Sequence, residues 1–162
     1  MQVSKISLIM KKAPFPAIMS VISFILFIGV YWLVTVKSIE PYYLEGLLYA
    51  VPFICFRIIT YNTIKGKLKI NASSIITTLM VFVFGIAAFI LLFLMSFESA
   101  TTVTKDAGKY ERVLKLNNYP ENLLINHFPK KIPNDAKIIK FSYCPGLLQG
   151  GEKFDLKFET SS

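Results

Sequence analysis

The sequence predicts a membrane α-helical protein with three transmembrane helices and a small C-terminal α+β extracytoplasmic module that contains a β-hairpin. Hydrophobic residues make up 54% of the 162 residues and charged residues only 17%. Uncharged runs of 24 and 28 residues separate Lys12 from Lys37 and Lys69 from Glu98. An apolar helix of about 18 residues or more is long enough to cross the hydrocarbon core of a bilayer. Both runs therefore predict transmembrane helices, and alternating apolar residues near the C-terminus predict the hairpin.

The first predicted span covers residues 17–36 and follows a basic N-terminal segment, residues 1–16. A secretory signal peptide is the alternative, but its apolar region is only about 7–15 residues long and is followed by small residues at a cleavage site. The run in this chain is longer, and it ends with Tyr31, Trp32 and Lys37 close together. We therefore interpret it as an uncleaved membrane anchor.

Residues 42–61 form a second, weaker candidate for a span. Only 11 uncharged residues separate Glu45 from Arg57, but the whole segment as a helix reaches about 30 Å. These two residues are the candidate intramembrane charges. Near opposite ends of a span, they fit the way long charged side chains reach the interface. Pro52 predicts a kink, and a re-entrant or interfacial helix is the rival interpretation.

The distribution of charged residues predicts the orientation in a plasma membrane. Lysines crowd the N-terminal segment and the loop of residues 62–72, whereas the connection from Lys37 to Glu45 carries one lysine and two glutamates. Cytoplasmic loops carry the excess of basic residues. The N-terminus and the lysine-rich loop are therefore predicted to be cytoplasmic, with residues 37–41 outside. A third span at residues 73–97 then places the C-terminal segment outside.

Residues 98–162 are predicted to form the outer module. One or two short helices come first and are interrupted between Asn117 and Pro120. A β-hairpin follows at residues 137–160, with its turn within Pro145–Glu152. A lone hairpin is marginal in water, so its apolar face must pack on the helices, the membrane or a partner. That face is predicted to carry Ile139 and the candidate interaction residues Phe141, Tyr143, Phe154, Leu156 and Phe158.

A resemblance accompanies this pattern at residues 127–159. The run "HFPKKIPNDAKIIKFSYCPGLLQGGEKFDLKFE" contains an "FP-x-x-IP-x-x-A" stretch and an "F-x-Y-x-PG-x-LQGG" hairpin. In both features it resembles an uncharacterised group of small membrane-anchored proteins from Gram-positive bacteria. The resemblance implies a bacterial membrane protein, and it implies further chain after the last strand.

The residue inventory argues against several kinds of chemistry. The net charge of +8 comes mostly from lysines beside the spans rather than from one basic face, so no nucleic-acid partner is expected. His127 is the single histidine, and a metal centre usually needs several ligands. We therefore predict no metal and no cofactor. A nucleophilic pair of Cys144 and His127 lacks any supporting signature, and Cys55 falls within a predicted span.

The function predicted from these features is non-catalytic. We expect an anchored accessory or interaction protein whose partners are the lipid bilayer and an unidentified membrane or envelope protein. The first alternative is a small oligomeric transporter, channel or holin-like component assembled around Glu45 and Arg57. The second is a cell-envelope enzyme, for which Glu121, His127 and Asp135 are titratable residues without a convincing arrangement.

Overall fold

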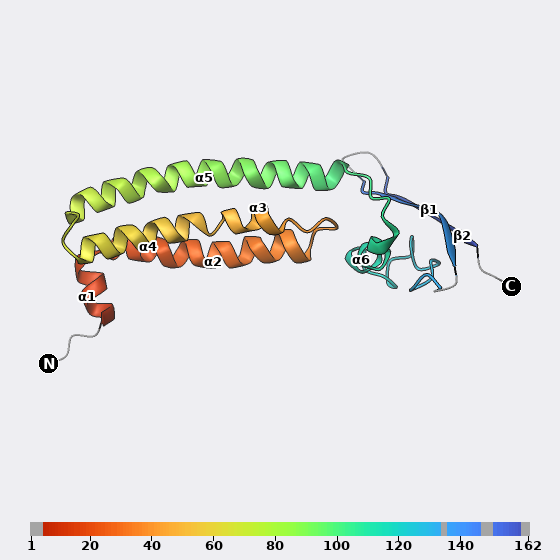
Figure 1. The fold of residues 1–162 in the computed structure, drawn as a ribbon, viewed down its shortest axis with the longest axis horizontal. Coiled ribbons are helices and arrows are strands. Elements are labelled where there is room, and N and C mark those ends of the chain that lie inside the picture. The colour runs from red at the N-terminus through yellow and green to blue at the C-terminus, as the bar shows by residue number, and fades with distance from the viewer. Residues whose placement is uncertain (1–4, 134–135, 147–150, 160–162) are drawn as a thin grey trace. The chain divides into compact units, whose positions relative to one another are not determined.

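The structure, a computed structural model, describes residues 5–133, 136–146 and 151–159. Helices α1 to α5 come first along the chain, followed by a 3-10 helix, helix α6 and strands β1 and β2 (Figure 1). The predicted fold class is confirmed in this respect: three long apolar helices precede a short helix and a C-terminal two-stranded antiparallel hairpin.

The chain divides into two compact units. The first, which we call the membrane unit, comprises Met1–Val36 and Pro41–Leu92, and the second, the terminal module, comprises Lys37–Glu40 and Phe93–Ser162. The short loop Lys37–Glu40 thus belongs to the module although it lies between two helices of the membrane unit in the sequence.

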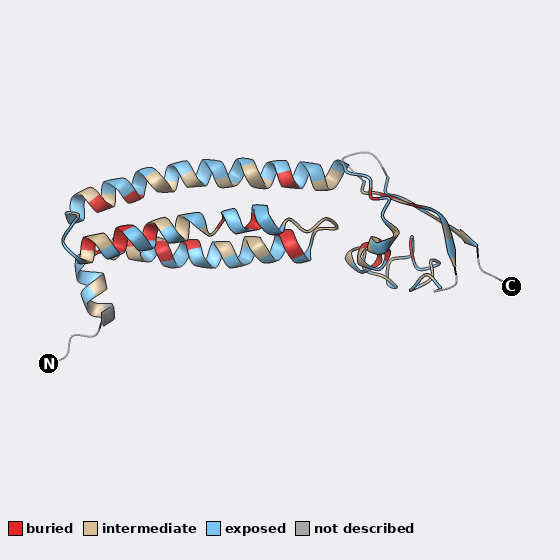
Figure 2. Ribbon diagram, in the orientation of Figure 1, coloured by how far each residue is buried: buried red, intermediate tan, exposed pale blue. Residues whose placement is uncertain are grey.

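Three helical segments are long and apolar enough to cross a membrane. They are α2 (Pro14–Val36), the pair α3 (Tyr43–Leu48) and α4 (Val51–Ile64), and α5 (Ile70–Thr101). Only 6% of the most apolar stretch of α5 is buried inside the chain, and Figure 2 shows its surface to be mainly exposed. A helix that is hydrophobic all round requires an apolar environment. These helices therefore indicate a multi-pass membrane protein, with the short helix α1 (Lys5–Lys12) before the first span.

The second span is interrupted, as Pro52 suggested. Helix α3 ends at Leu48, and α4 begins at Val51 with Pro52 in its first turn, where the missing N–H of proline costs no helical hydrogen bond. Tyr49 lies at the break, and its hydroxyl donates to the carbonyl of Ala88 in α5 at 3.0 Å. Within α3, Gly46 is buried, and a Cβ there would lie 3.0 Å from the Tyr31 ring. The absence of a side chain thus permits close packing of α3 on α2.

The lysine-rich loop begins with a left-handed glycine. Gly66 has a φ of 75° directly after the C-cap of α4, a conformation that glycine adopts without strain. Its N–H donates to the carbonyl of Thr63, and the next N–H, of Lys67, donates to the carbonyl of Asn62 at 2.9 Å. This pair of bonds is the Schellman arrangement that ends many helices. The sequence Lys65-Gly66-Lys67 therefore ends α4 and turns the chain toward α5.

The terminal module is built from a 3-10 helix (Ala107–Lys109), α6 (Tyr110–Leu116), β1 (Lys137–Cys144) and β2 (Lys153–Glu159). The two strands pair antiparallel, with Phe141 opposite Leu156 and Tyr143 opposite Phe154. Thr104 adds an isolated bridge to Tyr143 on the other side of β1.

The alternation predicted for β1 is wrong at Ile139. The pairing register shifts between Ile138 and Lys140, which leaves Ile139 as an extra residue in the strand. Such a bulge interrupts the strict two-residue period of side-chain directions. Ile139 is consequently 44% exposed, while Phe141 and Tyr143 point into the module.

The core of the module lies between α6, the following loop and the hairpin. Its buried members are Tyr110, Val113, Leu114, Ile125, Phe141 and Tyr143, and Phe128, Phe154 and Leu156 pack against them. Phe154 lies at the centre of the aromatic contacts, with ring centroids 4.3 Å from Phe128 and 5.8 Å from Tyr110. Inclined ring pairs at these distances are favourable. The hairpin is therefore stabilised by packing on helix and loop, as its marginal stability requires.

Candidate functional site

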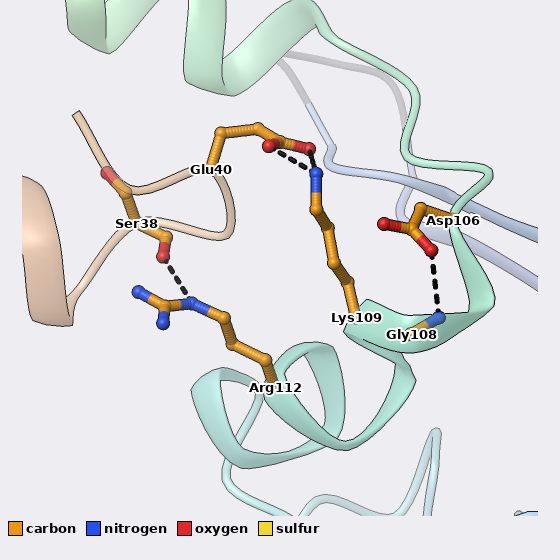
Figure 3. Close-up of polar contacts among 6 residues, drawn as sticks. All are labelled: Ser38, Glu40, Asp106, Gly108, Lys109 and Arg112. Carbon is orange, nitrogen blue, oxygen red and sulfur yellow. Dashed lines mark hydrogen bonds and ion pairs between the residues drawn. The ribbon is translucent and has the colours of Figure 1, made fainter. Parts of the chain in front are cut away.

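A polar contact joins the loop Lys37–Glu40 to helix α6 within the terminal module (Figure 3). The guanidinium Nε of Arg112 donates to the backbone carbonyl of Ser38 at 2.9 Å. The ammonium group of Lys109 forms an ion pair with both carboxylate oxygens of Glu40. We call these four residues the clamp.

The start of α6 positions the basic half of the clamp. Asp106 precedes the 3-10 helix, and its carboxylate accepts a hydrogen bond from the N–H of Gly108 at 2.9 Å. This contact satisfies a backbone donor at the helix start that would otherwise lack a partner. Lys109 and Arg112 are separated by one helical turn and so lie on the same side of the helix. Their spacing directs two cationic groups at one loop (Figure 3).

The clamp is suited to holding chain segments together rather than to chemistry. The side chains of Lys109 and Glu40 are 29% and 39% exposed, so water weakens their attraction. The contact from Arg112 goes to a backbone carbonyl, which is present whatever side chain residue 38 carries. A positioned tether of this kind needs no reactive group.

Two tyrosines of the module have strongly altered acidity. Burial raises the pKa of Tyr110 to about 12, with a smaller contribution from Tyr119. Burial also raises the pKa of Tyr143, and a 2.5 Å hydrogen bond from its hydroxyl to Glu152 adds to the effect. Tyr110 and Tyr143 are 1% and 3% exposed, so a substrate could not reach either hydroxyl. The altered pKa values therefore reflect core packing.

The predicted interaction residues of the hairpin lie in or against this core. Phe141 and Tyr143 are buried, Phe154 and Leu156 pack on the buried cluster, and Phe158 is half-buried. Their apolar face is covered by α6 and by the loop that contains Phe128. A partner that binds the hairpin must therefore use its edges or its outer face, and binding itself stays a prediction.

Glu45 and Arg57 are both exposed on the surface of the membrane unit. Glu45 lies in the first turn of α3, where a negative charge is favourable beside the positive end of the helix dipole. Arg57 lies in the middle of α4. The cavities described in this unit, of about 240 and 180 Å³, are lined by other residues, including Tyr49, Pro52 and Phe84. A transport role for the two charges stays a prediction.

Among the described residues considered for catalysis, no hydrogen bond or ion pair joins one to another. His127 is exposed and its ring contacts Phe128, with centroids 4.2 Å apart. The thiol of Cys144 lies 3.7 Å from the carbonyl of the next residue, and no hydrogen bond joins it to His127 in the described part of the chain. Glu121 is exposed, and Asp135 lies outside the described residues. Within the described ranges, no group of three or more His, Cys, Asp or Glu is arranged to hold a metal.

The clamp was not predicted from the sequence. Lys109 and Glu40 are 69 residues apart, and Arg112 and Ser38 are 74 apart. The available signal was weak: one glutamate in a short loop after an apolar run, and two basic residues one helical turn apart in the module. That signal does not select a pair among the many charged residues of the module.

Comparisons with family models, curated proteins and solved structures gave no match for this chain. The functional argument therefore depends on the chain's own geometry.

Proposed function

We propose that this chain is a membrane-anchored, non-catalytic interaction protein that displays its terminal module on the extracytoplasmic face of a plasma membrane. The observation that carries the proposal is the clamp, which attaches Lys37–Glu40 to α6. This contact requires the loop after α2 and the segment after α5 to lie on one side of the bilayer.

If α2 and α5 both cross the bilayer, this contact favours an arrangement with three crossings. If the segment Tyr43–Ile64 crosses the membrane, the chain returns after α2, crosses again with α5 and emerges on the side of the loop. If that segment stays at one surface, α5 carries the module to the opposite side from Lys37–Glu40, and the clamp cannot form. The clamp therefore supports three crossings over a re-entrant helix, independently of hydropathy and charge.

The choice of side rests on the lysines. Lys65, Lys67 and Lys69 lie in the loop between α4 and α5, at the opposite end of the spans from the module in a three-span arrangement. Because basic loops remain cytoplasmic, the module is proposed to face outward.

An interaction role is favoured by the form of the module. Its aromatic residues contribute to its own core, its described residues include no cluster of three or more His, Cys, Asp or Glu, and β2 pairs only with β1 among the described strands. An open strand edge can accept a strand from a partner. We therefore propose the outer edge of β2 as the docking element for a membrane or envelope protein.

Carbodiimide coupling tests whether the loop and the module lie on the same side. This reagent joins a carboxylate and an amine only where they are in contact. Glu40 and Lys109 of the native chain in membranes should be joined, as detected by mass spectrometry of the digested protein. Lys109→Arg retains the charge and lacks a reactive amine, so it is the matched control. Absence of the Glu40–Lys109 product in folded protein would contradict the three-span proposal.

A second measurement determines the side. A membrane-impermeant maleimide is applied to intact cells that produce the Cys55→Ser, Cys144→Ser chain with Lys157→Cys, an exposed position on β2. Labelling without lysis is expected, and the cysteine-free parent chain is the control. Labelling only after the cells are opened would place the module in the cytoplasm while leaving the three crossings intact.

A further inference from the structure

The loop after α6 presents two adjacent leucines that the module leaves uncovered. Leu123 is 82% exposed and Leu124 is 71% exposed, whereas the next residue, Ile125, is 3% exposed. For comparison, Phe89 on the apolar helix α5 is 72% exposed. The exposed fractions of these two leucines are thus similar to that of Phe89 on the apolar helix α5.

The backbone of this loop holds the leucines in place. The N–H of Leu124 donates to the side chain of Asn122 at 3.0 Å, and the side-chain amide of Asn122 donates to the carbonyl of Asn117 at 3.1 Å. Asn118 adopts a left-handed conformation with a φ of 56°, which asparagine tolerates better than most residues. Buried Ile125 anchors the end of the loop in the core. A defined, hydrogen-bonded turn therefore holds Leu123 and Leu124 in exposed positions.

We propose that Leu123 and Leu124 form an apolar tip that inserts into the interfacial region of the membrane in which the chain is anchored. This inference rests on the membrane anchoring in the proposed function, and it does not depend on which face carries the module.

The tether keeps the tip close to the bilayer. Thr102 and Val103 alone separate the end of α5 from Thr104, which pairs with Tyr143 of the hairpin. Two extended residues add at most about 7 Å of reach. A folded unit of about 60 residues has a radius of gyration of only about 10 Å. Helix α5 has 32 residues and is about 18 Å longer than a core of roughly 30 Å requires, so chain connectivity keeps the start of the module within about 25 Å of the bilayer, the nearest apolar phase for an exposed apolar tip.

A groove of the same module that carries basic side chains suits the headgroup region. This groove is lined by Lys115, Lys130 and Tyr119, with Glu111 and Leu114. Lys115 and Lys130 are exposed, and their ammonium groups match the phosphates of lipid headgroups. Apolar residues that enter the acyl boundary beside basic residues at headgroup level are the usual composition of an interfacial contact.

A protein partner fits this tip less well. A stable protein interface buries roughly 800 Å² on each partner, and two leucine side chains supply only a small part of such a surface. A bilayer requires no complementary shape, so a small apolar tip is sufficient for shallow insertion.

Depth-dependent fluorescence quenching tests the inference. The full chain with Cys55→Ser, Cys144→Ser and Leu123→Cys is labelled with an environment-sensitive fluorophore. It is then reconstituted in phosphatidylcholine vesicles that contain phosphatidylglycerol. Lys157→Cys on β2 is the matched control, and Leu124→Cys is a second reporter. We expect blue-shifted emission at both leucine positions, and at least about threefold stronger quenching by shallow spin-labelled lipids than at residue 157, as insertion by about 5–10 Å requires.

Each other outcome overturns the proposal. Emission typical of water at both leucine positions, with quenching by aqueous iodide equal to that at residue 157, means that the tip remains in solvent. Blue-shifted emission without quenching by lipid means that protein, such as a second copy of the chain, covers the tip. Neither result affects the carbodiimide test of the three crossings, so the two proposals fail independently.

Discussion

The membrane unit and the terminal module bury opposite kinds of side chain. In the module, the innermost residues are large and apolar: Tyr110, Val113 and Leu114 are at most 2% exposed. In the membrane unit, the buried set is rich in hydroxyl residues, namely Ser20, Ser23, Thr60, Thr63, Ser73 and Thr77, while most large apolar residues lie outside. The two units thus have opposite distributions of polarity.

The difference follows from the solvent of each unit. In water, apolar burial stabilises the fold, whereas lipid offers no such driving force between helices, and small residues that permit close packing are favoured. Several of the buried hydroxyls donate to carbonyls of their own helix, whereas the hydroxyl of Thr77 has no hydrogen-bond partner among the described residues. The hydroxyls of Thr60 and Thr63 donate to the carbonyls four residues earlier, at 2.7 and 2.8 Å. An exposed leucine is therefore ordinary in the membrane unit, whereas in the module it requires an explanation.

The largest effect is expected from an aromatic deletion in the module. Phe141→Ala should destabilise the module by about 3–5 kcal/mol, because it leaves a cavity beside Tyr110 and Phe154. Pulse proteolysis of the full chain in detergent measures the loss. Trp32, the single tryptophan, lies in α2 and reports separately on the membrane unit.

Ile139→Ala is the matched control for this deletion. It removes an aliphatic side chain from the same strand, but at a position that is 44% exposed, and it should have little effect. Equal destabilisation by the two variants would contradict the description of Phe141 as a core residue and would reopen its role as a contact residue.

A second change tests packing in the membrane unit. Gly46→Leu places a side chain against Tyr31 and Val34, where even a Cβ would lie within 3.0 and 3.1 Å. Overpacking of this kind costs about 1–3 kcal/mol. The midpoint of denaturation by sodium dodecyl sulfate, monitored by the fluorescence of Trp32, should shift to a lower detergent concentration. Gly29→Leu in α2 is the control, because a Cβ there meets nothing within 4 Å. A module-specific loss of protease resistance in Gly46→Leu would argue against separate units.

A pH titration distinguishes the units without mutation. Burial raises the pKa of Tyr110 to about 12 and also raises that of Tyr143. A raised folded pKa means that the contribution to stability is complete below the unfolded value of about 10 and is lost as pH rises toward 12. The protease resistance of the module should therefore fall above pH 10. Tyrosinate absorbance should show these two residues ionising last, together with unfolding. Early ionisation of all module tyrosines in a folded chain would contradict their burial.

The sequence predicted the regular features of both units. Uncharged runs reveal spans because lipid imposes a length, and alternation reveals strands because water imposes a buried face. The sequence did not predict the bulge at Ile139, because a single extra residue in a strand leaves no distinct pattern. It did not predict the clamp either, because its partners are 69 and 74 residues apart in the chain. Of the one or two short helices predicted for the module, none forms at Leu123 and Leu124, because these residues lie in a turn stabilised by hydrogen bonds of the Asn122 side chain.

The smallest effect concerns the clamp, which joins the loop Lys37–Glu40 to α6 within the terminal module. Lys109→Ala should destabilise the module by only about 0.2–1 kcal/mol, because a partly exposed ion pair contributes little. A double-mutant cycle with Glu40→Gln isolates the pair, measured as protease resistance at low and high salt. Its coupling energy should shrink at high salt as charges are screened.

The ion pair Lys140–Asp155 is the reference for this cycle. It joins β1 to β2 at 2.8 Å with both side chains more than half exposed, so its coupling should be no larger than that of the clamp. If the clamp couples by several kcal/mol, the loop and α6 form a rigid connection, and a change in the spans would reach the module through it. If its coupling is small, the ion pair holds the loop against α6 only weakly, as expected for partly exposed charges.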